Sequence, residues 1–313
     1  MTLVLVSCSS GPSTPSQIDP AAVVTESRTW VESSRPTPPN GGVAGAESRT
    51  LETRLWYAPE SLDAIPCGAS GCGVLLLAHG WGGRTARLDV LARLLAARGW
   101  IVAAPSFPLT HDRTPGGHQS GLGDLLRQPG DLSFVLDQLL AAAAETDDAL
   151  FGRIDPARVG VIGHSLGGAT AIGLTRHPCC TDPRFIAASL VAPAVYTVPI
   201  FGGETSAIGP PTLIVHGTAD QTVAPRFSIG LYESIAPPKI LVLLDGLNHA
   251  SLIESASDDP GNIPPTAELL DAFFGETLAG GDDLTAALDV IEMAGHEVRR
   301  QETVLDEGEA ATP

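Results

Sequence analysis

The sequence is poor in positive charge and has no long apolar run. Lys and Arg number 18 against 36 Asp and Glu, and no basic stripe is present to neutralise phosphates, so a nucleic-acid-binding role is not favoured. No stretch approaches the roughly 20 apolar residues that a membrane-spanning helix needs. A phosphate loop, a dinucleotide motif, a metal-ligand cluster and internal repeats are also lacking, so no cofactor is expected.

The composition of the chain suits one large hydrophobic core followed by an acidic C-terminal region. Hydrophobic residues make up 43% of the 313-residue chain. Residues 254–313 carry 15 acidic side chains against Arg299 and Arg300, which indicates a solvated tail. We predict three parts: a leader with a Ser/Pro-rich linker over 1–20, a folded domain over 21–279, and an acidic tail with one weak amphipathic stretch over 280–313.

The N-terminus contains the segment Leu5-Val-Ser-Cys8, followed by a Ser/Pro-rich stretch. The segment resembles the lipobox of bacterial lipoproteins, in which the cysteine is lipidated, and the following stretch suits a flexible tether. The resemblance implies a lipid anchor at Cys8 and an extracytoplasmic location. No Lys or Arg precedes the apolar run, which is about half the usual length of a signal-peptide core. The alternative is a short leader on a soluble protein.

Four further cysteines are present, and in an exported protein an even number is compatible with two disulfides. Cys67 and Cys72 flank a Gly-Ala-Ser-Gly turn, so a bridge between them is geometrically easy. Cys179 and Cys180 are adjacent, and a bridge between neighbours is strained. Cys179 and Cys180 could therefore instead be cross-linked to the first pair or be two free thiols, and the sequence does not decide between these alternatives. We assign all four cysteines a structural role.

Short apolar runs alternate with segments of helical periodicity, which predicts an α/β fold with a mostly parallel, doubly wound sheet. The predicted strands, the first two forming an antiparallel pair, are 23–31, 49–57, 74–78, 100–104, 159–162, 185–191, 212–216 and 240–244. The predicted helices are 84–98, 132–145, 165–177, 226–235 and 266–278, with Asp131 as the cap of the second. The Gly-, His- and Pro-rich residues up to Gly130 predict a long loop before that helix.

Gly163-His-Ser165-Leu-Gly167 fits the nucleophile-elbow pattern G-x-S-x-G. The pattern alone is weak, but an apolar strand runs into it and a helix follows it. Such a turn holds its serine in a strained conformation, and residues two before and two after must lack side chains, as Gly163 and Gly167 do. The helix N-terminus then directs N–H groups at the serine oxygen. Ser165 is the predicted nucleophile; an ordinary glycine-rich turn is the alternative.

The acid and the histidine of such a site follow the serine in that order. Asp220 follows the strand at 212–216, and His249 follows the strand at 240–244. Parallel strands present these positions at one rim of the sheet. We predict that His249 accepts the serine proton and that Asp220 orients the imidazole. Asp245 competes for the acid role, but it lies in the same short loop as His249.

Two N–H groups are needed for the oxyanion. We assign them to Leu166, directly after the nucleophile, and to Trp81 in the loop His79-Gly-Trp-Gly-Gly83. His79 is interpreted as a hydrogen-bonding support of that loop rather than as a base. His164 is assigned to the variable position of the elbow. The histidines assigned to loops or to the surface are His111, His118 and His177.

With these residues placed, the chain is similar to the α/β-hydrolase group that contains platelet-activating-factor acetylhydrolases, chlorophyllases and bacterial cutinases or PET hydrolases. The segments that carry the resemblance, between Ala21 and Leu278, are 49–59, 79–83, 163–168, 216–220 and 246–249. The resemblance implies an α/β-hydrolase fold and a serine carboxylic-ester hydrolase. In cutinase-like members the oxyanion-loop aromatic also clamps the substrate, which implies that role for Trp81. Dienelactone hydrolases, a further relative, use cysteine, and Ser165 argues against that chemistry.

The chain departs from the family pattern in two places. Leu166 stands where those enzymes usually carry Met, and the loop 107–130 has no counterpart in compact polyesterases. About 19 residues separate Val191 from Pro211, too few for a large helical lid. We expect an open site for short-to-medium acyl or aromatic esters, with polyesters among the candidates. An acyltransferase with the same triad and an inactive exported binding lipoprotein are the alternatives.

Overall fold

The structure is a computed structural model, and it describes residues 18–59, 67–117, 123–254 and 265–302. Cys8 and His118 lie outside these ranges, so the lipid anchor stays a prediction. Within them, no helix is both long enough and apolar enough to cross a bilayer.

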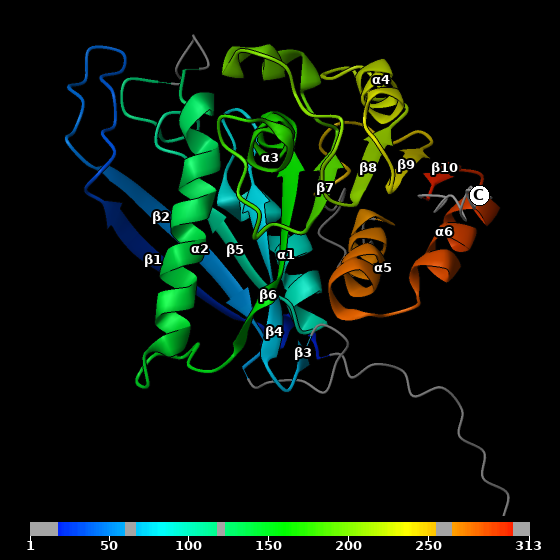
Figure 1. The fold of residues 1–313 in the computed structure, drawn as a ribbon, viewed down its shortest axis with the longest axis horizontal. Helices are drawn as coiled ribbons and strands as arrows, with labels where there is room; N and C mark the ends of the chain where they lie inside the picture. Colours follow the sequence, from blue (N-terminus) through cyan, green and yellow to red (C-terminus); the bar gives the residue numbers. More distant parts are fainter. Residues whose placement is uncertain (1–17, 60–66, 118–122, 255–264, 303–313) are drawn as a thin grey trace, which may run out of the picture.

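One sheet of ten strands forms the centre of the molecule (Figure 1). Its strands are β1 Val24–Glu32, β2 Arg49–Tyr57, β3 Cys67–Gly68, β4 Gly71–Ala78, β5 Ile101–Pro105, β6 Ile154–His164, β7 Ala187–Val191, β8 Thr212–Gly217, β9 Lys239–Leu244 and β10 Glu297–Gln301. Their order is β1-β2-β5-β4-β6-β7-β8-β9-β10, with β3 pairing with β4. Strands β4 to β9 are parallel, whereas β1, β2 and β10 run antiparallel to their neighbours.

Helices cover both faces of the sheet (Figure 1). They are α1 Asp89–Ala97, α2 Gln128–Ala144, α3 Leu166–Arg176, α4 Arg226–Ser234, α5 Pro265–Ala279 and α6 Leu284–Met293, with 3-10 turns η1 Pro20–Ala22, η2 Thr85–Leu88, η3 Leu125–Arg127 and η4 Val195–Phe201. One large core cluster joins the sheet to α1, α5 and α6, and a second large cluster joins it to α2, α3 and α4. The strand order and pairing confirm the predicted doubly wound, mostly parallel sheet with an antiparallel N-terminal pair. The central strands are apolar on both faces because helices cover both sides of the sheet.

The C-terminal region differs from the tail that the sequence predicts. Residues 284–293 form α6, and residues 297–301 form β10, which pairs with β9 at the edge of the sheet. Leu284, Leu288 and Ile291 are buried in the core cluster that also contains α5. These three side chains recur at helical spacing, so the weak amphipathic stretch is a docked helix. The prediction missed β10 because its residues are mostly charged, as is common for an edge strand.

The long loop ends earlier than predicted, and Asp131 is not a helix cap. Helix α2 begins at Gln128, where Pro129 fits the first turn. Asp131 lies one turn inside the helix and accepts two hydrogen bonds from the buried guanidinium of Arg49, each 2.6 Å long. The need to pair this buried cation overrides the local preference of Asp for a cap position.

Both pairs of cysteines are bonded within the pair. Cys67 and Cys72 close the turn between β3 and β4, as their spacing suggested. Cys179 is bonded to Cys180 just beyond the end of α3. Cross-links between the two pairs, which the sequence left open, are not formed.

Docking of α6 can be tested on two of its residues. Leu288 is 4% exposed and Val290 is 60% exposed. Leu288→Ala should lower the free energy of unfolding by about 2–5 kcal/mol, because a cavity replaces a buried side chain. Val290→Ala should change it by less than about 0.5 kcal/mol. Urea denaturation measures both; equal, small effects would show that residues 284–293 are a tail.

Candidate active site

Ser165 lies at the junction of β6 and α3 in a strained backbone conformation. Its φ is 56° and its ψ is −118°. Its N–H donates to the carbonyl of Val191, and its own carbonyl accepts from the N–H of Ala194, each at 2.9 Å. Ala192, between those partners, also has a positive φ. Because both backbone groups of Ser165 are fixed to the end of β7, the strained turn is held in place and the side chain stands at its apex.

The glycines of the elbow are required by close approaches of backbone. A Cβ at Gly163 would lie 2.2 Å from the carbonyl oxygen of Gly167. A Cβ at Gly167 would lie 2.0 Å from the carbonyl oxygen of Ala78 on β4. Helix α3 therefore approaches β6 and β4 at distances that only glycine allows. This close approach is the steric reason for the two glycines of the sequence pattern.

Asp220 and His249 meet at the carboxyl ends of β8 and β9. The Nδ1 of His249 lies 2.6 Å from Oδ2 of Asp220, and the Asp220 carboxyl is fully buried. The N–H groups of Thr222 and Val223 donate to Oδ1 of Asp220. Burial alone would raise the pKa of Asp220, but these bonds and the one from His249 hold it below its ordinary value. The carboxylate is thus ionised and aimed at Nδ1, which leaves the lone pair of neutral His249 on Nε2.

Asp245, the competing acid, is directed elsewhere. Its Oδ1 accepts a hydrogen bond from the hydroxyl of Thr218 at 2.9 Å, and its N–H donates to Nδ1 of His296. The carboxylate that contacts His249 is that of Asp220.

His216 is a buried neighbour of Asp220, and no separate role was predicted for it within the segment 216–220. Its Nε2 lies 2.9 Å from the carbonyl of Val223 and 3.2 Å from Oδ2 of Asp220, and its Nδ1 accepts from the hydroxyl of Ser228 at 2.6 Å. Burial lowers the pKa of His216, so the ring is neutral and donates from Nε2. Its position four residues before Asp220, at the end of an apolar strand, was the available signal.

His164 connects the elbow to the loop that carries His249. Its Nε2 donates to the carbonyl oxygen of His249 at 3.0 Å, and the two rings lie 4.6 Å apart. Burial, with a smaller effect from His249, lowers the pKa of His164 to about 3. The residue before Ser165 therefore holds the loop of His249 against the elbow while remaining neutral.

His79 orients the loop 79–83, which is the predicted oxyanion loop. The N–H of Phe107 donates to Nε2 of His79, so Nδ1 carries the proton and donates to the carbonyl of Gly80 at 2.8 Å. The N–H of Gly83 donates to the same carbonyl. In a trans peptide the N–H points opposite to the carbonyl, so these bonds fix the direction of the Trp81 N–H. Burial lowers the pKa of His79 to about 4, so this support is neutral.

The segment after β5 lies directly against this loop. The N–H of Gly82 donates to the carbonyl of Thr110 at 2.8 Å, and the N–H of Asp112 donates to the carbonyl of Gly83 at 3.2 Å. The described part of the loop 107–130 is therefore a support of the oxyanion loop.

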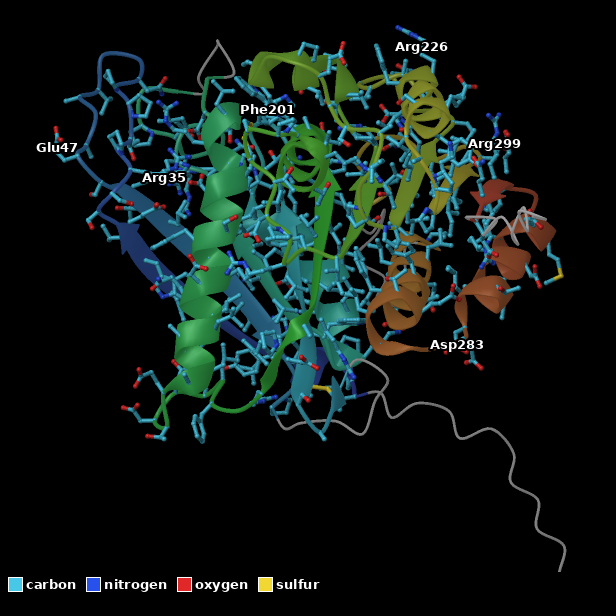
Figure 2. The ribbon with its side chains drawn as sticks, viewed as in Figure 1. Arg35, Glu47, Phe201, Arg226, Asp283 and Arg299 are labelled. Carbon is cyan, nitrogen blue, oxygen red and sulfur yellow. A yellow bond between two sulfur atoms is a disulfide. The ribbon has the colours of Figure 1, made fainter. Side chains whose placement is uncertain are left out.

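Exposed aromatic side chains lie on two segments near Ser165, the loop 79–83 and the turn after β7. Trp81 is 40% exposed, and Tyr196 is 54% exposed with its ring 5.3 Å from that of Phe227. Between β7 and β8 the chain forms only η4, which is too short for a large lid. At its end Phe201, labelled in Figure 2, packs in a small core cluster with Leu166.

One group of metal-ligand residue types occurs in the described part of the chain. Ligand atoms of His177, Cys179 and Cys180 lie within 4.8 Å of one another. The two sulfurs are bonded to each other, and Nδ1 of His177 accepts the N–H of Cys179. A disulfide offers no thiolate, so this group is structural in the oxidised form. His177, assigned to a loop or to the surface, lies in the loop after α3, where it is 4% exposed beside Phe201.

Three neutral histidines, two of them buried and His164 half-buried, predict acid sensitivity. His79, His164 and His216 have pKa values below 6.5, the ordinary value of the unfolded chain. Between pH 6.5 and about 4 the unfolded state binds protons that the folded state excludes, so stability should fall as pH decreases. Urea midpoints at pH 7.5, 6 and 5 measure this, and His164→Phe should show a shallower decline. An unchanged midpoint across this range would contradict the assignment.

Comparison with known proteins agrees with this arrangement. No curated protein matches the chain significantly. The family model described as PET hydrolase-like matches residues 65–259, which is more than half of the chain and includes the oxyanion loop, the elbow, Asp220 and His249. The resemblance drawn from the sequence, and with it the α/β-hydrolase fold, is therefore confirmed. The chain belongs to the PET hydrolase-like family and is a serine ester hydrolase of the α/β-hydrolase type.

Proposed function

We propose that the protein hydrolyses carboxylic esters through an acyl-enzyme on Ser165, with His249 as the base and Asp220 as the acid that orients it. The observation that carries the proposal is the 2.6 Å contact between His249 Nδ1 and Asp220 beside a serine held at a φ of 56°. The N–H groups of Trp81 and Leu166 are the proposed oxyanion donors.

In the first half of the reaction, Oγ of Ser165 attacks the ester carbonyl carbon while Nε2 of His249 takes the hydroxyl proton. The ionised Asp220 stabilises the imidazolium. The carbonyl oxygen becomes an oxyanion, to which Trp81 and Leu166 donate, the latter from the N-terminus of α3. The intermediate collapses, and the alcohol leaves with the proton of His249.

In the second half, water replaces the alcohol. Its oxygen attacks the acyl carbon as His249 takes one of its protons, and a second oxyanion forms between the same donors. Collapse returns the proton to Oγ of Ser165 and releases the carboxylic acid, so the enzyme is restored without any cofactor in the scheme.

The substrate is proposed from the rim of the site. Trp81 is exposed next to its own N–H donor and offers a flat apolar wall to an acyl or aromatic group. The short η4 leaves no large lid between β7 and β8. Short-to-medium acyl esters and aromatic esters fit these features, and the family match supports including polyesters.

A chromogenic butyrate ester and a fluorophosphonate probe test the assignment. The wild type should turn over the ester and be labelled at Ser165, and Ser165→Ala should lose both. Asp220→Asn should reduce kcat by about 10⁴-fold because the imidazole adopts the wrong tautomer. Asp245→Asn is the matched control and should retain activity, since Asp245 bonds to Thr218.

Unchanged turnover in Asp220→Asn would assign the acid role to another residue. Lack of both turnover and labelling in the wild type would remove the enzyme proposal. Adding an alcohol acceptor and finding new ester as the main product would favour an acyltransferase.

The contact between the oxyanion loop and the nucleophile gives a second prediction. A Cβ at Gly80 would lie 2.9 Å from Cβ and 3.4 Å from Oγ of Ser165. Gly80→Ala should therefore displace the serine or the loop and reduce kcat by about 100-fold, the effect of a small misplacement. Gly230→Ala is the control, because a Cβ there meets nothing within 4 Å. Equal activity of both variants would contradict the placement of Gly80.

A further inference from the structure

A buried glutamine bridges the two sides of the proposed oxyanion hole. Gln128 is the first residue of α2 and is 0% exposed. Its Nε2 donates to the hydroxyl of Thr110 at 2.8 Å, and its Oε1 accepts from the hydroxyl of Thr170 at 2.5 Å. Both threonines are also completely buried. The carboxamide is thus used at both ends, once as donor and once as acceptor.

Each threonine lies next to one proposed oxyanion donor: Thr110 contacts the loop that carries Trp81, and Thr170 belongs to the helix that begins with Leu166. The carbonyl of Thr110 accepts the N–H of Gly82, the residue directly after Trp81. Thr170 lies on α3, and its hydroxyl is 3.4 Å from the carbonyl of Leu166, the first residue of that helix. A displacement of either threonine would therefore shift a backbone group that adjoins one of the two proposed oxyanion donors.

The segment around Thr110 is anchored from the other side by charge. Oδ2 of Asp124 accepts the N–H of Leu109, and Oδ1 of Asp124 lies 2.8 Å from the buried guanidinium of Arg49. These contacts hold the segment in place next to Thr110. The side chain of Gln128 then connects Thr110 to α3. A buried amide with both ends bonded is stabilising, whereas an unpaired one is destabilising, so the site selects a side chain with both a donor and an acceptor.

We propose that Gln128 is a positioning residue that fixes the separation of the Trp81 and Leu166 N–H groups. The inference rests on the proposed function. Gln128 touches no reacting atom, and it acts by holding Thr110 and Thr170 at a set distance. Its loss should weaken stabilisation of the oxyanion, and so lower kcat, more than it weakens substrate binding.

The test compares an oxoester with the matching thionoester, in which sulfur replaces the carbonyl oxygen. Sulfur is a poorer hydrogen-bond acceptor, so hydrolysis of the thionoester depends less on the oxyanion donors. Gln128→Met keeps the length of the side chain and removes both bonds. It should lower kcat for the oxoester by about 10- to 100-fold with little change in KM, and lower the thionoester rate much less.

The control is Gln138→Met, the same change on the same helix, which should leave both rates unchanged. If Gln128→Met does not fold, Thr110→Val and Thr170→Val each remove one of the two bonds and should show the same preferential loss on the oxoester. Equal loss on both esters, or no loss, would overturn the positioning role. Failure of the proposed function is distinguishable, because the wild type would then show no hydrolysis dependent on Ser165.

Discussion

The strained backbone at Ser165 is the constraint on which the rest of the site depends. Strand β6 turns into α3 within one residue, and hydrogen bonds to Val191 and Ala194 hold that residue at a positive φ. The turn requires glycine at two flanking positions, since the backbones of β4, β6 and α3 nearly touch. The same turn places Ser165 directly before the first N–H group of the helix.

The surroundings of the turn are kept in place by buried and half-buried histidines that remain neutral. His79 orients the oxyanion loop, His164 joins the elbow to the loop of His249, and His216 contacts Asp220. Burial lowers the pKa of each, so all three donate or accept hydrogen bonds without carrying charge. The ionised Asp220 is consequently the dominant charge beside His249, which would favour the imidazolium of the proposed mechanism.

The elbow, the order of Ser165, Asp220 and His249, and the doubly wound sheet were predictable because each follows from a local pattern: apolar strands, a helix after the serine, and acid and histidine at strand ends. The role of His216 and the ion pair of Asp131 were not, since they depend on partners distant in the sequence. Strand β10 was missed for a related reason: an edge strand of charged residues has no apolar alternation, and only pairing with β9 reveals it.

We propose that Ser165 stands between the backbone N–H groups of Trp81 and Leu166. A crystal structure of the protein inhibited by an alkyl phosphonate would test this placement. We expect a covalent bond from Oγ of Ser165 to phosphorus, with one phosphonyl oxygen about 2.7–3.1 Å from the N of both Trp81 and Leu166. A phosphonate attached elsewhere, or an oxygen directed away from both donors, would contradict it.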